Sequence, residues 1–199
     1  MKFLSFSDVH GDKKSIKDML KRAKEDDIDF VVCCGDFSQF GHGIIEFLTL
    51  FNEIGKKIYL IPGNHEEMET LFDDALVSFD NCISLHKKVQ KIGDYYFLGY
   101  GGGGFSQEDA DFRKVSREWY GKYRGKKIVL VTHQPPLGTK LDLLENRHIG
   151  NKDYYKFIKR IQPKVAISGH LHETMGEVDR IGKTRIINPC WEGMVIELN

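Results

Sequence analysis

The sequence lacks any run of apolar residues that could cross a membrane, and its charges cancel, with 29 Lys and Arg against 29 Asp and Glu. A bilayer span needs about 20 consecutive apolar residues, so we expect no membrane partner. A net charge of zero gives no overall attraction to nucleic acid. Asp8 follows too soon after the start for a signal peptide, and we expect a cytoplasmic protein.

Cysteine is also scarce. The four cysteines include no Cys-x-x-Cys pair, which argues against a structural zinc site. Cys33 and Cys34 are neighbours on a predicted buried strand, so their side chains point to opposite faces and cannot easily bridge. Cys82 and Cys190 are isolated along the chain. We therefore expect reduced and mostly buried thiols.

Repeats, low-complexity tracts and linkers rich in proline or serine are absent as well. The hydrophobic content of 41% and the charged content of 29% are ordinary for a globular protein. We predict a single domain over residues 1–199, large enough for a core of two or more layers.

Hydrophobic periodicity predicts alternating strands and helices in the first part of the chain, an order that favours a largely parallel sheet. The expected strands are 2–7, 30–34 and 57–61, and the expected helices are 13–25 and 44–54. After about residue 83 the segments shorten, and Gly93-Asp94 between two of them is a hairpin signal. Here we expect strands at 88–92, 95–100, 128–131, 165–168, 175–181, 184–188 and 194–198, and helices at 107–123 and 152–161. The pattern predicts two mixed sheets.

Five short motifs each follow a predicted strand. They are Asp8-Val9-His10, Gly35-Asp36, Gly63-Asn64-His65-Glu66, Thr132-His133 and Gly169-His170-Leu171-His172. Loops beyond the carboxyl ends of strands are where open α/β sheets place their sites. Each motif supplies oxygen or imidazole groups that can bind a metal, and together they are enough for two metal ions.

The spacing within the motifs suits metal binding. Residues two apart on an extended backbone point to the same side, so Asp8 and His10 can hold one ion together, and His170 and His172 repeat this spacing. Asp36 has two carboxylate oxygens with which to bridge two ions.

The remaining ligand types are an amide and a further imidazole, from Asn64 and His133. Gly35, Gly63 and Gly169 each stand directly before a ligand, where we expect a sharp turn that needs the conformational freedom of glycine. Nitrogen and oxygen ligands without thiolate suit Mn, Fe, Zn, Co or Ni.

In this order, the motifs resemble those of the calcineurin-like metallophosphoesterase superfamily, over nearly the whole chain. The resemblance implies two mixed β-sheets packed face to face and flanked by helices, a four-layer α/β/β/α sandwich. It also implies two divalent metal ions, with Mn expected first and Fe, Zn, Ni or Co as alternatives. One metal would be held by Asp8, His10, Asp36 and His172, the other by Asp36, Asn64, His133 and His170, and the catalytic acid would be His65.

The expected activity is hydrolysis of a small phosphate ester. Four charges from two divalent cations, less two carboxylates and one bridging hydroxide, leave a site of about +1 that attracts anionic phosphate. We expect attack by a metal-bridging hydroxide, because metal coordination lowers the pKa of water to about 7. His65 would protonate the leaving alkoxide.

Phosphodiesters are favoured over phosphomonoesters, because the chain resembles small members of the superfamily that act on diesters and because the sequence shows no clear arginine clamp for a dianionic monoester. A phosphomonoesterase of similar mechanism is the nearest alternative. A non-catalytic scaffold of the same fold, as in the retromer coat, is another, although such scaffolds lose the catalytic histidine that His65 matches here. The sequence does not determine the oligomeric state, and a homo-oligomer is one of the states that it allows.

Several residues near the motifs have more than one interpretation. Asp12 and Glu66 either orient ligand imidazoles or favour helix starts. His148 lies between two ligand loops, and whether it touches substrate is left open. We expect Trp191 at the rim of the site. Cys190 stands where many members of the superfamily have glycine.

Overall fold

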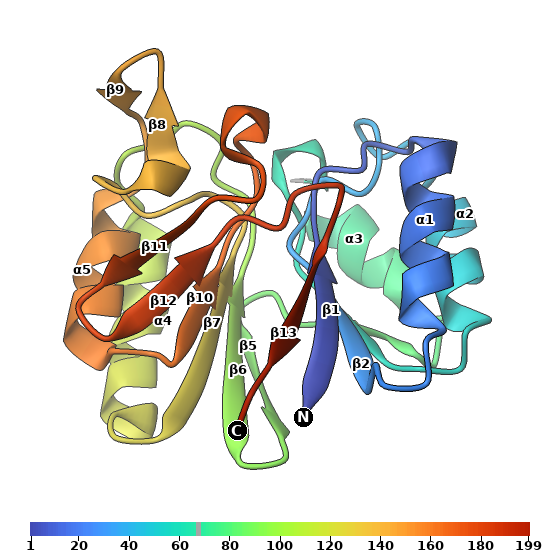
Figure 1. The fold of residues 1–199 in the computed structure, drawn as a ribbon, viewed down its shortest axis with the longest axis horizontal. Coiled ribbons are helices and arrows are strands. Elements are labelled where there is room, and N and C mark those ends of the chain that lie inside the picture. Colours follow the sequence, from blue (N-terminus) through green and yellow to red (C-terminus); the bar gives the residue numbers. More distant parts are fainter. Residues whose placement is uncertain (67–68) are drawn as a thin grey trace.

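Two mixed β-sheets form the centre of the computed structural model, which describes residues 1–66 and 69–199 (Figure 1). In spatial order, the first sheet consists of β13 (Met194–Glu197), β1 (Lys2–Phe6), β2 (Phe30–Cys33), β3 (Ile58–Leu60) and β4 (Cys82–Ser84). Strands β1 to β4 are parallel to their neighbours, and β13 runs antiparallel to β1.

The second sheet is mixed in the same way, with parallel strands at its centre and antiparallel strands at its edges. Its order is β11 (Val178–Ile181), β12 (Thr184–Ile187), β10 (Val165–Ile167), β7 (Lys127–Thr132), β6 (Tyr95–Tyr100) and β5 (Lys88–Ile92). A separate two-stranded ribbon consists of β8 (Leu143–Leu144) and β9 (Arg147–His148).

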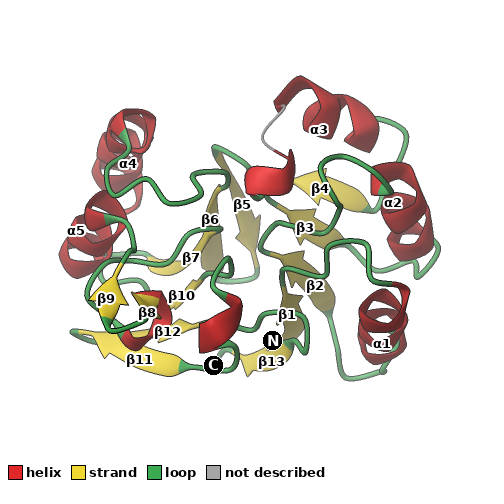
Figure 2. Ribbon diagram, turned by 90° about the horizontal axis from the view of Figure 1, so that it is seen from above, coloured by secondary structure: helices red, strands yellow, loops and turns green. Residues whose placement is uncertain are grey.

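Helices cover both outer faces, which confirms the predicted four-layer α/β/β/α arrangement (Figure 2). The first sheet is covered by α1 (Lys13–Ala23), α2 (Ile44–Asn52) and α3 (Glu69–Leu76), and the second by α4 (Ala110–Tyr123) and α5 (Lys152–Ile161). Three single turns of 3-10 helix span Asn64–Glu66, Lys140–Asp142 and His172–Thr174. Among the described helices, none is long and apolar enough to cross a membrane.

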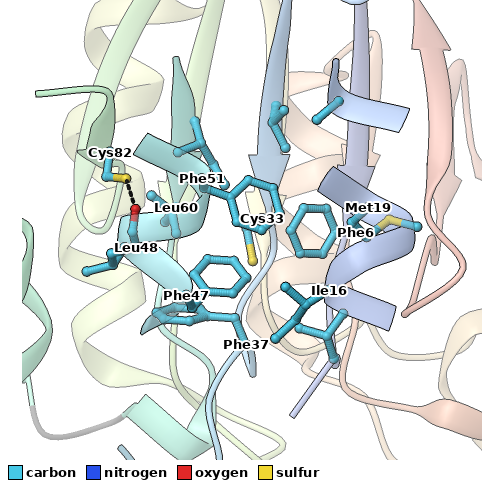
Figure 3. Packing of buried hydrophobic residues seen from close by; sticks show 14 of the residues in the cluster. Phe6, Ile16, Met19, Cys33, Phe37, Phe47, Leu48, Phe51, Leu60 and Cys82 are labelled. Atoms are coloured by element: carbon cyan, nitrogen blue, oxygen red, sulfur yellow. Dashed lines mark hydrogen bonds between the residues drawn. The ribbon is translucent and has the colours of Figure 1, made fainter. Parts of the chain in front are cut away.

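Alternation along the strands divides the buried side chains among three cores. On β1, Phe3 faces the second sheet, whereas Phe6 faces the helices of the first. The third core lies between the second sheet and its helices. Figure 3 shows the first core, in which Phe6 packs with Phe47 and Phe51 of α2. Cys33 and Cys34 enter different cores, as predicted, and all four cysteines are free and buried.

Several short elements were not expected from the sequence: α3, β4, the β8–β9 ribbon and the 3-10 turns. Helix α3 covers only two turns, and β4 has three residues. Segments this short do not show a repeating hydrophobic pattern, and their conformation depends on packing against the rest of the fold. The predicted helix 107–123 begins at Ala110, because the Asp109 side chain accepts a hydrogen bond from the N–H of Phe112 and caps it there.

The topology brings the loops after β1, β2, β3, β7 and β10 to one rim, where the carboxyl ends of both sheets face each other. Backbone hydrogen bonds join these loops. The N–H of Asp8 donates to the carbonyl of Gly35 at 3.0 Å, and the N–H of Gly169 donates to the carbonyl of His133 at 2.9 Å. The motifs therefore meet at one place.

Candidate metal centre

The loops at this rim bring the seven predicted metal ligands together. Ligand atoms lie within 4.8 Å of one another in each of three groups. The groups are Asp8, His10 and His172; His10, Asp36 and His65; and Asp36, His133 and His170. Asn64 joins the third group, because its Oδ1 lies 3.0 Å from Nε2 of His133.

Distances within the groups fit two neighbouring cation sites. In one, the Nε2 atoms of His10 and His172 are 3.1 Å apart, and Nε2 of His172 is 3.8 Å from Oδ1 of Asp8. In the other, Nε2 of His133 lies 3.4 Å from Oδ2 of Asp36. The same Oδ2 lies 3.9 Å from Nε2 of His10. Asp36 thus faces both groups with one oxygen.

Two further observations favour a metal at these positions. Donor atoms bound to one ion at about 2.1 Å lie about 3.0–3.4 Å apart at tetrahedral or octahedral angles, and the separations of 3.0–3.9 Å lie in or near this range. Among the residues that the structure describes, the buried Nε2 of His170 has no hydrogen-bond partner. Since a buried polar atom without a partner is destabilising, a cation would satisfy this nitrogen.

The backbone of the predicted ligands is itself unusual. Asp8, His10, Asp36 and His170 all have positive φ angles, between 44° and 73°. This left-handed region is uncommon for residues other than glycine, and each instance costs about 1–3 kcal/mol. Such conformations concentrate at functional sites, where the surrounding structure enforces them.

The glycines before the ligands were expected to supply the turns, and this is correct only for Gly35, whose φ is 97°. Gly63 and Gly169 do not have positive φ angles. They are required by space, because a Cβ on Gly63 would overlap Oδ1 of Asp36 and one on Gly169 would overlap Oδ2 of Asp8. After Gly169 the positive φ angle is that of the predicted ligand His170, and both glycines leave the space that neighbouring loops need to approach closely.

Glu66 holds two of these loops together. Its buried carboxylate accepts hydrogen bonds from the backbone N–H groups of Asp36 and Ser38, both at 2.8 Å, and of Gly63 at 3.0 Å. The Ser38 hydroxyl donates to the same carboxylate. The suggestion that Glu66 orients an imidazole is therefore wrong. Asp12, the other acid considered for that role, caps α1 through the N–H of Ser15.

A hydrogen bond between Nδ1 of His133 and the carbonyl of Cys34, at 2.8 Å, orients the ring of His133. Burial alone would lower the pKa of His133, but the negative charge of Asp36 and a hydrogen bond to it raise this pKa to about 9. Burial would in turn raise the pKa of Asp36, yet the charge of His133 and the N–H of His65 hold it below its usual range. Burial and the charge of His133 lower the pKa of His170 to about 3.

Burial raises the pKa of Glu66 to about 7, with a contribution from the charge of Asp36 and against the hydrogen bonds from Ser38 and Gly63. The described ion pairs of Asp8 and Asp36 are all with histidines. The rim is therefore a cluster of imidazoles around two buried carboxylates, and both kinds of group are common ligands of divalent metal ions.

Other residues raised by the sequence lie at various distances from this cluster. Trp191 meets the ring of His172 edge-on at 5.1 Å, as expected for the rim. His148 is on β9, where its Nδ1 lies 2.8 Å from Oδ1 of the buried Asp142. Cys190 is buried with a φ of 41°, which explains why glycine suits this position.

Two aromatic residues at the site were missed. Phe40 stacks on the ring of His65, with centroids 4.0 Å apart, and Phe105 meets the ring of His170 edge-on at 4.7 Å. Both are largely exposed. Apolar residues in loops carry no periodic signal, and only their neighbours Gly41 and Gly104 could have drawn attention to them.

The chain is similar in sequence to known proteins. A family model described as calcineurin-like phosphoesterase matches residues 1–174. Protein MJ1162 of Methanocaldococcus jannaschii, described as uncharacterized, is 31% identical over 201 residues, covering 95% of this chain and 88% of its own.

Solved structures extend the comparison to the fold. The protein TT1561 of Thermus thermophilus superimposes with a TM-score of 0.78 at 13% identity, over 95% of this chain and 88% of its own. A dimetal phosphatase from Danio rerio gives a TM-score of 0.61 at 10% identity, over 94% and 86%. At these identities the likeness concerns the fold alone.

Proposed function

Because the chain belongs to the calcineurin-like phosphoesterase family, we propose that it is a dinuclear metal-dependent phosphodiesterase that acts on small phosphate esters. The position of Asp36 Oδ2, 3.9 Å from Nε2 of His10 and 3.4 Å from Nε2 of His133, carries this proposal. A carboxylate oxygen between two imidazole groups is suited to bridge two ions.

Each proposed ligand has a place in this arrangement. One ion would be held by Asp8, His10, Asp36 and His172, and the other by Asp36, Asn64, His133 and His170. We propose Mn as the metal, on the resemblance to the family. Bound divalent ions would neutralise the anionic ester and make hydroxide available at neutral pH.

His65 is the proposed proton donor to the leaving alkoxide. Its Nε2 lies 4.0 Å from Oδ2 of Asp36, and its backbone N–H donates to Oδ1 of the same carboxylate at 2.9 Å. The side chain is 18% exposed, which leaves it access to a leaving group at the rim. Its presence beside the ligands favours catalysis over a scaffold role.

The preference for diesters rests on the charges around the site. None of the five motifs contains an arginine. A phosphomonoester carries a second negative charge that an arginine commonly binds. A diester has one charge and needs no such partner.

Hydrolysis assays test this function. Metal-stripped protein is reconstituted with Mn, and turnover of bis-p-nitrophenyl phosphate is compared with that of p-nitrophenyl phosphate. We expect metal-dependent turnover that favours the diester and is lost in Asp36→Asn but kept in Asp111→Asn, an exposed carboxylate on α4. A preference for the monoester would indicate a phosphomonoesterase, and no turnover with Mn, Fe, Zn, Co or Ni would favour the scaffold.

A further inference from the structure

Two exposed phenylalanines stand beside the proposed catalytic groups. Phe40 is 71% exposed and Phe105 is 65% exposed. The Phe40 ring lies almost parallel to that of His65, with an interplanar angle of 19°, whereas Phe105 contacts His170 edge-on. His65 and His170 belong to different groups of the candidate metal centre. Aromatic rings with open faces thus border both parts of the site.

Phe40 is held in a conformation that its residue type disfavours. It forms a two-residue turn with Gly41, and both have positive φ angles, of 50° and 84°. The turn is closed by backbone hydrogen bonds between Gln39 and His42, at 3.0 and 3.2 Å. Such turns favour Asn or Gly at these positions. Because the Phe40 ring is largely exposed, it adds little hydrophobic stabilisation to offset the cost of this backbone conformation. A phenylalanine at this position therefore indicates a functional role.

The turn is also rigidly connected to the site. Ser38 donates its backbone N–H and its hydroxyl to Glu66, and the N–H of Gly41 donates to the Ser38 hydroxyl at 3.2 Å. Glu66 in turn accepts from the N–H of Asp36. The position of Phe40 is therefore set by the same network that positions the proposed bridging carboxylate.

Phe105 is connected to the opposite part of the site by the glycine-rich loop 101–104. The N–H of Gly102 donates to the carbonyl of Pro62 at 2.8 Å. A Cβ on Gly104 would lie 3.9 Å from Cβ of Asn64, so the loop runs directly beside this proposed ligand. Phe105 follows at the end of the loop, where its ring reaches His170.

We propose that Phe40 and Phe105 stack against a flat ring of the substrate, which is therefore a phosphate ester of an aryl alcohol or of a nucleoside. This inference rests on the proposed function, since that function places the phosphate at the metal centre. Stacking of one ring on an aromatic side chain raises affinity by about 10-fold or more. A saturated ring of the same size lacks the flat π-face and gains less.

Binding to the Mn-loaded protein, measured by calorimetry, tests the proposal without turnover. The ligands are methyl phosphate, cyclohexyl phosphate, phenyl phosphate and uridine 5′-monophosphate, all of them monoesters of the kind that the proposed diester hydrolysis releases as products. We expect phenyl phosphate to bind about 10-fold more tightly than cyclohexyl phosphate, which has a ring of similar size. Tight binding of the uridine nucleotide as well would indicate a nucleoside ester, and tight binding of phenyl phosphate alone an aryl ester.

Substitutions connect this preference to the two residues. Phe40→Leu and Phe105→Leu keep an apolar side chain but remove the ring, and each should reduce the preference for phenyl over cyclohexyl phosphate by about 3-fold or more. Phe40→Tyr should retain it. Tyr155→Leu, which removes a ring from α5 on the outer face of the second sheet, is the matched control.

The outcomes separate this inference from the proposed function. If methyl, cyclohexyl and phenyl phosphate bind equally, or if both leucine variants keep the preference, the aromatic subsite is wrong while the phosphoesterase proposal stands. If no phosphate ester binds and bis-p-nitrophenyl phosphate is not hydrolysed, the proposed function fails and the subsite fails with it.

Discussion

The carboxylate of Glu66 accepts a hydrogen bond from the backbone N–H of Asp36 at 2.8 Å. Glu66 follows β3, whereas Asp36, the proposed bridging ligand, follows β2. A residue from a neighbouring segment of the chain therefore holds the backbone of Asp36 in place. Asp36 has a φ of 51°, and its strained backbone depends on such external support.

Replacement of Glu66 should therefore destabilise the protein. Glu66→Gln puts an NH2 group against backbone donors and leaves at least one of them unpaired. Since an unsatisfied buried group costs about 1–3 kcal/mol, we expect the free energy of unfolding in urea to fall by at least this amount. Glu46→Gln, on the exposed face of α2, should change it by less than about 0.5 kcal/mol. Equal stability of both variants would contradict the role given to Glu66.

Substitution of the closely packed glycines should damage the metal centre. Gly63→Ala drives a Cβ into Asp36, and Gly169→Ala drives one into Asp8. We expect both variants to bind less Mn per chain, as measured by atomic absorption after dialysis. Gly121→Ala is the control: among the described residues, a Cβ at this position would meet no atom within 4 Å outside the neighbouring backbone of its own helix, and the substitution should stabilise α4 by about 0.5–1 kcal/mol. Full metal content in the Gly63→Ala and Gly169→Ala variants would show that the loops can shift to accommodate the added methyl group.

Loss of the proposed proton donor should depend on the leaving group. His65→Asn should slow hydrolysis of alkyl esters by about 10²–10⁴-fold, because a poor leaving group needs protonation. Aryl esters with p-nitrophenol as the leaving group should be slowed much less. Steady-state rates for the two ester types provide the measurement. Equal slowing of both would rule out an acid role for His65.

The metal-free protein should lose stability in acid through His170. Its pKa is about 3 in the folded state, against 6.5 for the ordinary group, so the unfolded chain takes up the proton first. The contribution of His170 to stability is complete above pH 6.5 and is lost as the pH falls from 6.5 towards 3, by about 1.4 kcal/mol per pH unit.

Urea unfolding at several pH values, with and without His170→Asn, isolates this contribution. Between pH 6 and pH 4, the stability of the wild type should fall more steeply than that of the variant. Parallel curves for the two proteins would mean that the pKa of His170 in the folded, metal-free protein is close to its ordinary value.

Much of the fold could be predicted from the sequence, because hydrophobic runs and glycine signals are local features. The strands after which the five motifs stand are β1, β2, β3, β7 and β10, and the structure places all five where the sequence predicted them. Helix α3 and strand β4 could not be predicted, because short segments receive their conformation from tertiary contacts.

The sequence by itself determined the types of group available for chemistry. It provides carboxylates, an amide and imidazoles in five motifs, and their order along the chain carries the resemblance to a family of metallophosphoesterases. It also determined that Cys33 and Cys34 would enter opposite faces of a sheet, because strand geometry alternates with a period of two residues.

Tertiary structure decided how these groups meet. Four predicted ligands adopt positive φ angles, Gly63 and Gly169 act through close approach, and Phe40 reaches His65 across two loops. None of this is encoded in local spacing, because the energy that holds a strained residue comes from contacts made by distant segments. The motifs contain the chemical groups, and their geometry arises only when the two sheets pack together.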